Sequence, residues 1–218
     1  PLKFNNLKIG AENFNLKNDE FIVTIKNLDG FFHSPFHKTI KASAFVKYKP
    51  GFIKLDKLKA SSGKNNLEGN LLIKGKNNSL RDFMSNVNIS MKILSSKLDL
   101  ASFNFKNNKF QDIPLTDLTF NLDGTLEDFR INDLNFSNTF LSFKGKGSAE
   151  KIFNDSNENF KIITDSLTLD IQKLKTFSFL STKFKKLIPI MSKLRLNGNT
   201  IFNKNFITFN FNSINDWG

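Results

Sequence analysis

The sequence predicts an all-β protein built on one long, curved, mainly antiparallel sheet, and three observations carry this prediction. Apolar and polar residues alternate with period two along most of the chain, as they do in a strand with one buried face. Clusters of turn-forming residues separate the alternating runs. The connections are too short for crossover helices, which excludes a regular α/β architecture.

The alternating runs predict about a dozen strands of about 5 to 10 residues each. Their clearest apolar positions are Leu118, Phe120 and Leu122; Phe129 and Ile131; Leu134 and Phe136; Leu167, Leu169 and Ile171; and Ile207, Phe209 and Phe211. Gly, Pro, Asn, Asp and Ser gather between the runs. Turns are therefore expected at residues 27–30, 49–51, 61–63, 122–124 and 197–199.

Two segments depart from period two. Residues 79–84 predict one helical turn, with Ser79 as the N-cap and Asp82 at the third helical position. In residues 172–191 the apolar residues recur at helical spacing, and Pro189 ends the pattern. This second segment predicts a short amphipathic helix at about 173–189, inserted among the strands; its apolar residues are Leu180, Phe184, Leu187 and Ile188.

Three stretches of the chain resemble one another, namely residues 4–23, 55–75 and 131–150. Each begins as apolar-x-x-Leu-x-apolar, continues with small or polar turn residues, and ends in another alternating strand. A chain of such hairpins brings its apolar faces together as a closed barrel, a sandwich or a long trough. We treat residues 1–218 as one repeat-built segment, and the start at Pro1 predicts a fragment of a longer protein.

The units at 55–75 and 131–150, together with the run ITDSLTLDIQKLKTF and the short helix after it, resemble the AsmA-like superfamily. The nearest branch is TamB, the translocation and assembly module, in its Bacteroidetes form. The resemblance covers most of the chain and is better from about residue 50 onward. It implies a periplasmic protein anchored in the inner membrane by an N-terminal helix.

The same resemblance implies a trough-shaped sheet whose apolar concave face carries phospholipid acyl chains toward the outer membrane. It also implies a role in outer-membrane assembly through a partner barrel protein. The candidate groove residues are Leu118, Phe120, Leu122, Phe129, Ile131, Leu134, Phe136, Leu167, Leu169, Phe209 and Phe211. The ordinary core of a sandwich or barrel would show the same alternation, so that reading stays open.

The chain is basic, with 32 Lys and Arg residues against 20 Asp and Glu and a net charge of +12. Around the predicted helix, Lys183, Lys185, Lys186 and Lys193 would meet anionic lipid head groups, or else cap the groove as solvated side chains. A nucleic-acid partner is disfavoured, because Arg occurs only at 81, 130 and 195 and the 26 Phe are joined by a single Tyr and a single Trp.

No catalytic or metal-binding motif is present, so we expect neither an enzyme nor a cofactor. His33 and His37 are the only histidines, and Pro35 between them argues against the helix that would aim both at one metal. Asp128, Asp133 and Asp165 are expected to be solvated acids at strand ends. The absence of Cys is compatible with an oxidising compartment such as the periplasm.

Two further functions remain open from the sequence. One is a structural or interaction module that pairs with a partner through exposed sheet edges. The other is a closed, lipocalin-like barrel for a small apolar ligand, which requires hydrogen bonding between the first and last strands. A trough requires no such pairing.

Overall fold

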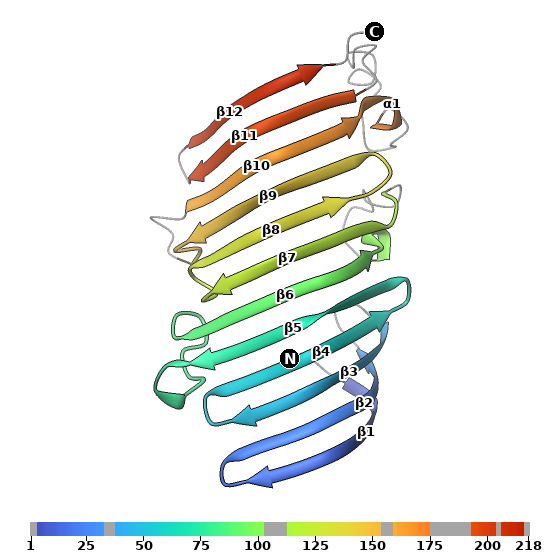
Figure 1. Ribbon diagram of the computed structural model, residues 1–218, viewed down its shortest axis with the longest axis vertical. Coiled ribbons are helices and arrows are strands. Elements are labelled where there is room, and N and C mark those ends of the chain that lie inside the picture. Colours follow the sequence, from blue (N-terminus) through green and yellow to red (C-terminus); the bar gives the residue numbers. More distant parts are fainter. Residues whose placement is uncertain are drawn as a thin grey trace.

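The computed structural model describes residues 4–32, 38–102, 113–153, 159–174, 193–203 and 206–215. Twelve strands form one sheet in which the spatial order equals the chain order (Figure 1). The strands are β1 (Phe4–Lys17), β2 (Glu20–Phe32), β3 (Lys38–Lys49), β4 (Phe52–Ser62), β5 (Asn65–Gly75), β6 (Val87–Leu98), β7 (Thr116–Gly124), β8 (Phe129–Ser137), β9 (Leu141–Glu150), β10 (Asn159–Asp170), β11 (Lys193–Asn203) and β12 (Phe206–Asn215). Every neighbouring pair is antiparallel, which confirms the predicted fold class.

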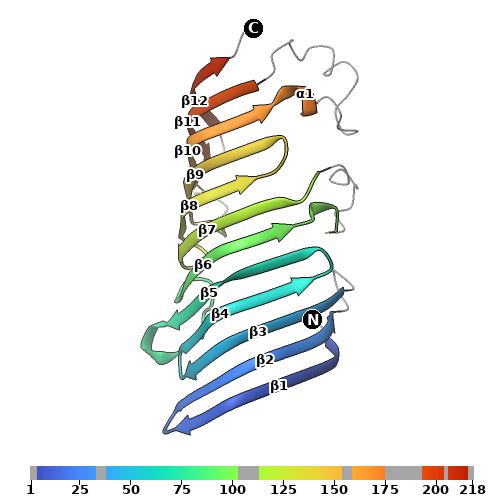
Figure 2. The ribbon, with the colours of Figure 1, turned by 45° about the vertical axis from the view of Figure 1, so that its right-hand side comes forward.

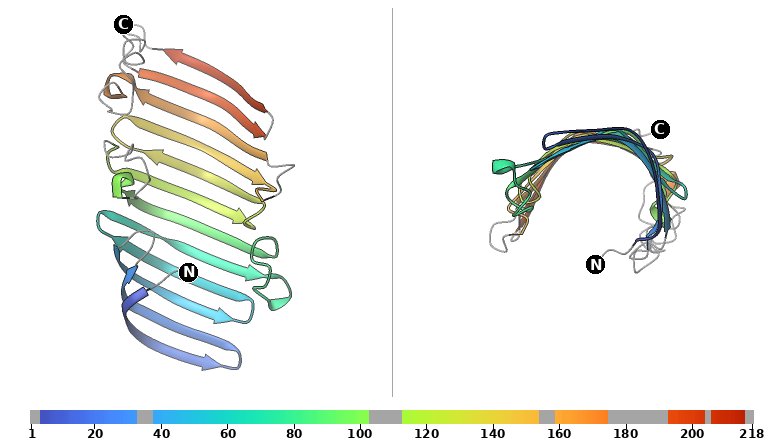
Figure 3. Two further views of the ribbon diagram at one scale, coloured as in Figure 1. Left: turned by 180° about the vertical axis from the view of Figure 1, so that it is seen from behind. Right: turned by 90° about the horizontal axis from the view of Figure 1, so that it is seen from below.

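The sheet is open and curved. Seen end-on, the strands bend together into an arch, and the views from the side show a single layer that twists from β1 to β12 (Figures 2 and 3). Within the described ranges, β1 pairs only with β2 and β12 only with β11. The closed, lipocalin-like barrel is therefore wrong for this fold, because the first and last strands share no hydrogen bonds.

The bend follows a row of β-bulges. Strands β2, β4, β6, β8 and β10 each carry one extra residue relative to their neighbours near mid-strand. A bulge bends its strand and raises the local twist, so bulges aligned across neighbouring strands bend the whole sheet along one line. We call this line the crease; its bulges lie between Ile25 and Leu28, Leu55 and Leu58, Ile93 and Ser96, Ile131 and Leu134, and Thr164 and Leu167.

The bulges explain the repeated sequence unit. In apolar-x-x-Leu-x-apolar, strict alternation would point the Leu to the face opposite the first apolar residue. The two residues between them form the bulge, and its extra residue places the Leu on the same face as the first apolar residue. Lys57 and Asp133 precede this Leu and adopt left-handed backbone angles, with φ of 52° and 51°. Asn6, before Leu7 in β1, has φ of 52° as well. The repeat is thus a signature of a β-bulge, which lies on the crease in β4 and β8 and near the start of the strand in β1.

Several local predictions were wrong. Eight of the twelve strands are 11 to 14 residues long, longer than the expected range of about 5 to 10, and two predicted turns lie inside strands. Residues 27–30 contain the β2 bulge, and 197–199 lie within β11, where Gly198 allows the backbone of β12 to approach closely. Residues 122–124 end β7 instead of forming the turn. The predicted turns at 49–51 and 61–63 are confirmed at the β3–β4 and β4–β5 connections.

Helical structure is sparse in the described ranges. Residues 79–84 form no helix; a 3₁₀ turn lies just before them at Lys76–Asn78, and a second occurs at Leu100–Ser102. The Ser79 hydroxyl accepts a hydrogen bond from the Arg81 amide at 3.2 Å, so it closes a turn of the loop without capping a helix. Helix α1 (Ile171–Leu174) begins where strand β10 ends, so Ile171 belongs to a helix, not to the predicted strand. The remainder of the predicted helix at 173–189 lies outside the described residues.

Candidate functional site

The register of the sheet collects its apolar residues on one face. Directly opposite residues on antiparallel strands point to the same side of the sheet, so a row of paired residues across successive strands lies on one face. Leu122 of β7 lies opposite Met91 of β6 and Ile131 of β8. On the following strands the pairs are Phe136 with Phe143, Phe143 with Leu167, and Leu167 with Leu196. We call this side the apolar face.

The apolar face lies on the concave side of the bend. Side chains converge on the inside of a bent single-layer sheet and diverge on the outside, so only the inner ones shield each other from water. In the described strands, every buried side chain occupies an apolar-face position, including Val23 (5% exposed), Ile93 (8%) and Ala149 (2%). No second layer covers them among the described residues, so contact within the curved sheet itself buries these residues.

All eleven candidate groove residues predicted from the sequence lie on the apolar face by register. Ten of them are half-buried, and Phe209 on the outermost strand β12 is 65% exposed. They come from β7, β8, β10 and β12, and those of the first three strands lie opposite one another or opposite residues of the same face on β6, β9 and β11. On β12, Phe209 and Phe211 lie opposite Thr200 and Gly198. The structure thus places these residues on one continuous surface.

The sequence prediction missed the half of this surface that β1–β6 supply. The same period-two signal could have found it, because Phe21-Ile22-Val23-Thr24-Ile25 and Leu71-Leu72-Ile73 place apolar residues at alternate positions. The apolar-face positions of this half include Val23, Ile25, Ala44, Val46, Ile53, Leu55, Leu71, Ile73, Ile89 and Ile93.

Charge is segregated to the other, convex face. Among the described strands, the apolar-face positions fixed by register hold no charged residue except Lys38, whose side chain is not described. The convex face carries the cross-strand ion pairs Lys26–Glu12 (2.8 Å), Lys47–Glu20 (2.9 Å), Lys59–Glu68 (3.0 Å) and Lys97–Asp117 (3.2 Å). Exposed pairs of this kind contribute at most about 1 kcal/mol each, so they keep this face soluble more than they stabilise the sheet.

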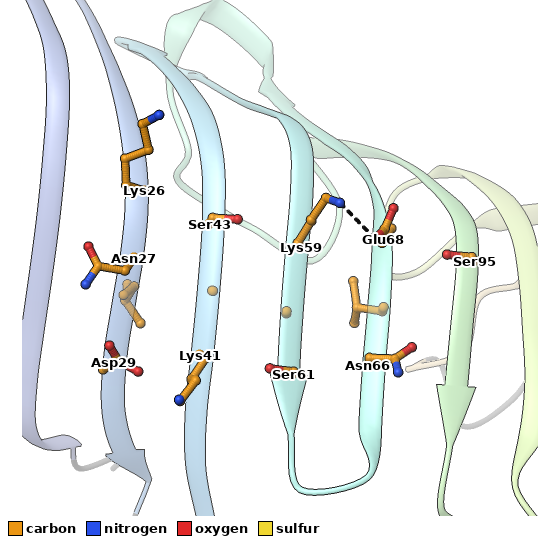
Figure 4. Close-up of a pocket in the computed structure, with 14 residues that line it drawn as sticks. Lys26, Asn27, Asp29, Lys41, Ser43, Lys59, Ser61, Asn66, Glu68 and Ser95 are labelled. Carbon is orange, nitrogen blue, oxygen red and sulfur yellow. Dashed lines mark ion pairs between the residues drawn. The ribbon is translucent and has the colours of Figure 1, made fainter.

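A broad, shallow depression of about 550 Å³ lies on the convex face over β2–β6 (Figure 4). Ser43, Ser61 and Ser95 form its floor, and longer side chains such as Lys59 and Glu68 rise around them and pair with each other. Its charges are balanced, since Lys26, Lys41 and Lys59 stand with acidic neighbours. The depression reflects small side chains among long ones and offers no apolar surface comparable to the concave face.

Glycines accompany the bulges along the crease. Gly145 lies opposite Leu134 and Thr164, and Thr164 lies opposite Gly198. A Cβ atom at Gly145 would overlap the carbonyl oxygen of Ile163 on the next strand, and one at Gly198 would overlap that of Asn210. The backbones therefore approach too closely here for any side chain, which marks these positions as glycine kinks of the bend.

The two outer strands expose their apolar residues most. Phe14 and Leu16 of β1 are 65% and 64% exposed, and Leu7 and Ile9 of the same strand are also exposed. On β12, Ile207 and Phe209 are exposed in the same way. Each outer strand also keeps one edge without a partner strand in the described part of the chain, which leaves its N–H and C=O groups open to pairing.

The charged candidates of the sequence prediction are placed differently. Lys193 begins strand β11 on the convex face opposite Asp170, so it is not part of a helix. Lys183, Lys185 and Lys186 lie outside the described residues, as do His33 and His37. Within the described ranges no group of three or more His, Cys, Asp or Glu side chains could hold a metal ion.

Two of the predicted strand-end acids lie at bulges instead. Asp133 accepts a hydrogen bond from the Asn121 amide at 2.6 Å, and Asp165 occupies the bulge of β10; both are exposed in mid-strand. Asp128 does lie in a turn, where its carboxylate accepts a hydrogen bond from the Lys151 amide at 2.9 Å. The pKa of Asp170 is lowered, first by the hydrogen bond from the Lys173 backbone N–H, which makes Asp170 a cap of α1. These contacts assign structural roles to the acids.

Comparison of the chain with protein-family models, with curated proteins and with solved structures gives no match. The helices of the described ranges are all too short, or too polar, to cross a membrane.

Proposed function

We propose that this protein binds phospholipid acyl chains along its concave apolar face and lets them move along the trough without covalent chemistry. The observation that carries the proposal is the continuity of this face. Apolar residues follow one another across all twelve strands, and the register positions of the face hold no charged side chain among the described ones. A surface of this kind suits methylene chains, which need neither hydrogen bonds nor a counter-ion.

The energetics favour such a ligand. Burial of a methylene group is worth about 0.8 kcal/mol, so a chain of about 16 carbons leaving water gains on the order of 10 kcal/mol. The open sheet lets a head group remain in water while its chains lie on the apolar face. Burial of the acyl chain alone is enough to keep the lipid bound without polar contacts. An apolar surface without specific contacts also lets the acyl chain slide along the trough.

The resemblance to the AsmA-like superfamily, and to TamB in particular, supports the setting of this proposal. We place the segment in the periplasm, within a longer protein anchored in the inner membrane, where it would conduct phospholipid between the inner and outer membranes. A partner barrel protein in outer-membrane assembly belongs to the same proposal. The trough-shaped sheet is the feature that this setting and the observed fold have in common.

Lipid extraction and native mass spectrometry of the purified chain test the proposal. Phe136 and Ser137 are consecutive on β8 and lie on opposite faces, so Phe136→Asp and Ser137→Asp place the same charge on the concave and convex sides. Phospholipid bound to the wild type and to Ser137→Asp, but lost from folded Phe136→Asp, is the expected result. Equal lipid content in both variants, or none in the wild type, would contradict the proposal.

The exposed outer strands favour a second candidate, an interaction module that pairs through its sheet edges. Phe14 and Leu16 on β1 and Phe209 on β12 expose apolar surface next to unpaired backbone in the described sheet. Sedimentation over a range of protein concentrations distinguishes the two functions. Edge pairing predicts association that Phe14→Lys weakens, without bound lipid, whereas the lipid proposal predicts bound phospholipid at every concentration.

A further inference from the structure

Another, smaller depression of about 180 Å³ lies on the convex face between β8, β9 and β10. Three cationic side chains line it, Arg130 of β8, Lys146 of β9 and Lys161 of β10, with the polar side chains of Asn132 and Ser148. The sequence prediction did not single out this cluster, because its members are far apart in the chain.

The register explains how the three cations meet. Ser148 lies directly opposite Arg130 on one side and Lys161 on the other, so the hydroxyl stands between the two cations in a single row across three strands. Lys146 follows two residues away on the same face of β9, next to Asn132. Hydrogen-bond donors of three kinds, guanidinium, ammonium and hydroxyl, therefore surround one small space.

Within the depression itself the charge of this cluster is entirely positive. No carboxylate lines the depression, and no ion pair joins Arg130, Lys146 or Lys161 to an acid in the part of the chain that the structure describes. Asp123 lies opposite Arg130 on β7, and Asp123, Asp128 and Glu150 line a neighbouring depression that Arg130 shares, but none of the three forms an ion pair with it among the described residues. In the larger depression of Figure 4, by contrast, Glu68 pairs with Lys59.

We propose that this cluster is a binding site for a phosphate group, borne either by a small soluble phosphate ester or by a lipid head group. Arg130 offers the two parallel N–H donors that phosphate oxygens accept, and the two lysines supply further positive charge. The volume of about 180 Å³ is below the range of about 300–1,000 Å³ typical of sites for whole small molecules, so the site holds a phosphate group and not a larger ligand.

This site is independent of the proposed acyl-chain function, because it lies on the opposite face of the sheet. A head group bound here cannot belong to a lipid whose chains lie in the trough at the same strands. Phosphate binding and lipid extraction from the concave face can therefore succeed or fail separately.

Titration of the full chain with inorganic phosphate at constant ionic strength, followed by amide NMR, tests the soluble source. A parallel arm measures binding to vesicles of phosphatidic acid in phosphatidylcholine. Arg130→Gln is the test variant, and Arg195→Gln is the matched control, since Arg195 is also an exposed arginine on the convex face, on β11. We expect a saturable response of the amides of Arg130, Ser148 and Lys161 that Arg130→Gln weakens about fivefold and Arg195→Gln leaves unchanged.

The arms also identify the source. A response to inorganic phosphate assigns the site to soluble phosphate esters, whereas an Arg130-dependent response to vesicles alone assigns it to a head group. The proposal is overturned if neither arm saturates, or if Arg195→Gln weakens binding as much as Arg130→Gln does.

Discussion

Gly145 tests the physical origin of the bend, because a single methyl group there meets the backbone of the next strand. The Cβ of alanine would overlap the Ile163 carbonyl oxygen and lie 2.8 Å from Cζ of Phe143, well inside the ordinary contact range of 3.4–4 Å. Overpacking costs about 1–3 kcal/mol, and the upper end applies because a strand carbonyl cannot rotate aside. Alanine recovers about 0.5–1 kcal/mol of chain entropy, so Gly145→Ala should lose about 2 kcal/mol of unfolding free energy.

Gly147 provides the control on the same strand and the same face. Its added Cβ would lie 3.2 Å from the Lys161 carbonyl oxygen, a contact that a shift of a few tenths of an ångström relieves. Gly147→Ala should therefore change stability by less than about 0.5 kcal/mol once the gain in chain entropy is included. Thermal unfolding followed by circular dichroism should show Tm lower by about 4–8 °C for Gly145→Ala alone. Equal Tm values for the two variants would refute the argument that close backbone approach requires glycine at the crease.

Three further outcomes follow from the same structure. Lys57→Gly at the β4 bulge, where φ is 52°, should raise the free energy of unfolding in urea by about 0.5–1 kcal/mol, because glycine adopts left-handed angles without the cost that lysine bears. A lower free energy of unfolding would contradict the bulge geometry. Ile93→Ala should lower the free energy of unfolding by about 2–4 kcal/mol and Leu16→Ala by less than about 1 kcal/mol, since Ile93 is 8% and Leu16 64% exposed. Similar losses in the two variants would show that the outer strand β1 is covered. The pKa of Asp170 lies below its ordinary value of 3.8, so its stabilising effect on α1 is present above that pH and is lost as the pH falls through the lowered pKa. Carbon NMR titration should find the lowering largely kept in Lys173→Ala, because the backbone N–H of residue 173 is its first cause; a return to 3.8 would contradict this.

The sequence predicted the fold class and one half of the apolar face because both depend on local alternation. Leu118, Phe120 and Leu122 alternate without interruption, and the structure places them on one face of β7. The antiparallel pairing of consecutive strands also followed from the sequence where the connections are short, since a short connection leaves a strand next to its predecessor. Local alternation alone does not separate a closed barrel from an open trough, because that choice depends on whether β1 reaches β12; the prediction of a trough came with the resemblance to the AsmA-like superfamily.

The bulges account for several of the errors along the chain. At residues 27–30 the Asn-Leu-Asp-Gly sequence resembles a turn, yet Asn27 is part of the β2 bulge and Leu28 returns to the apolar face. The sequence analysis missed the proposed phosphate site for another reason: Arg130 and Lys161 are brought together only by their shared partner strand, where both lie opposite Ser148 of β9. Contacts of that kind depend on register, which a single sequence does not specify.

The proposed function requires that the concave face, and not the convex one, binds acyl chains. A photo-crosslinking residue introduced at each position from 117 to 122 of β7, in the presence of radiolabelled phospholipid, tests it most directly. If acyl chains lie on the concave face, the crosslinking yield alternates with period two, high at Leu118, Phe120 and Leu122 and low at Asp117, Thr119 and Asn121. Equal yields at odd and even positions, or labelling confined to the odd ones, would contradict it.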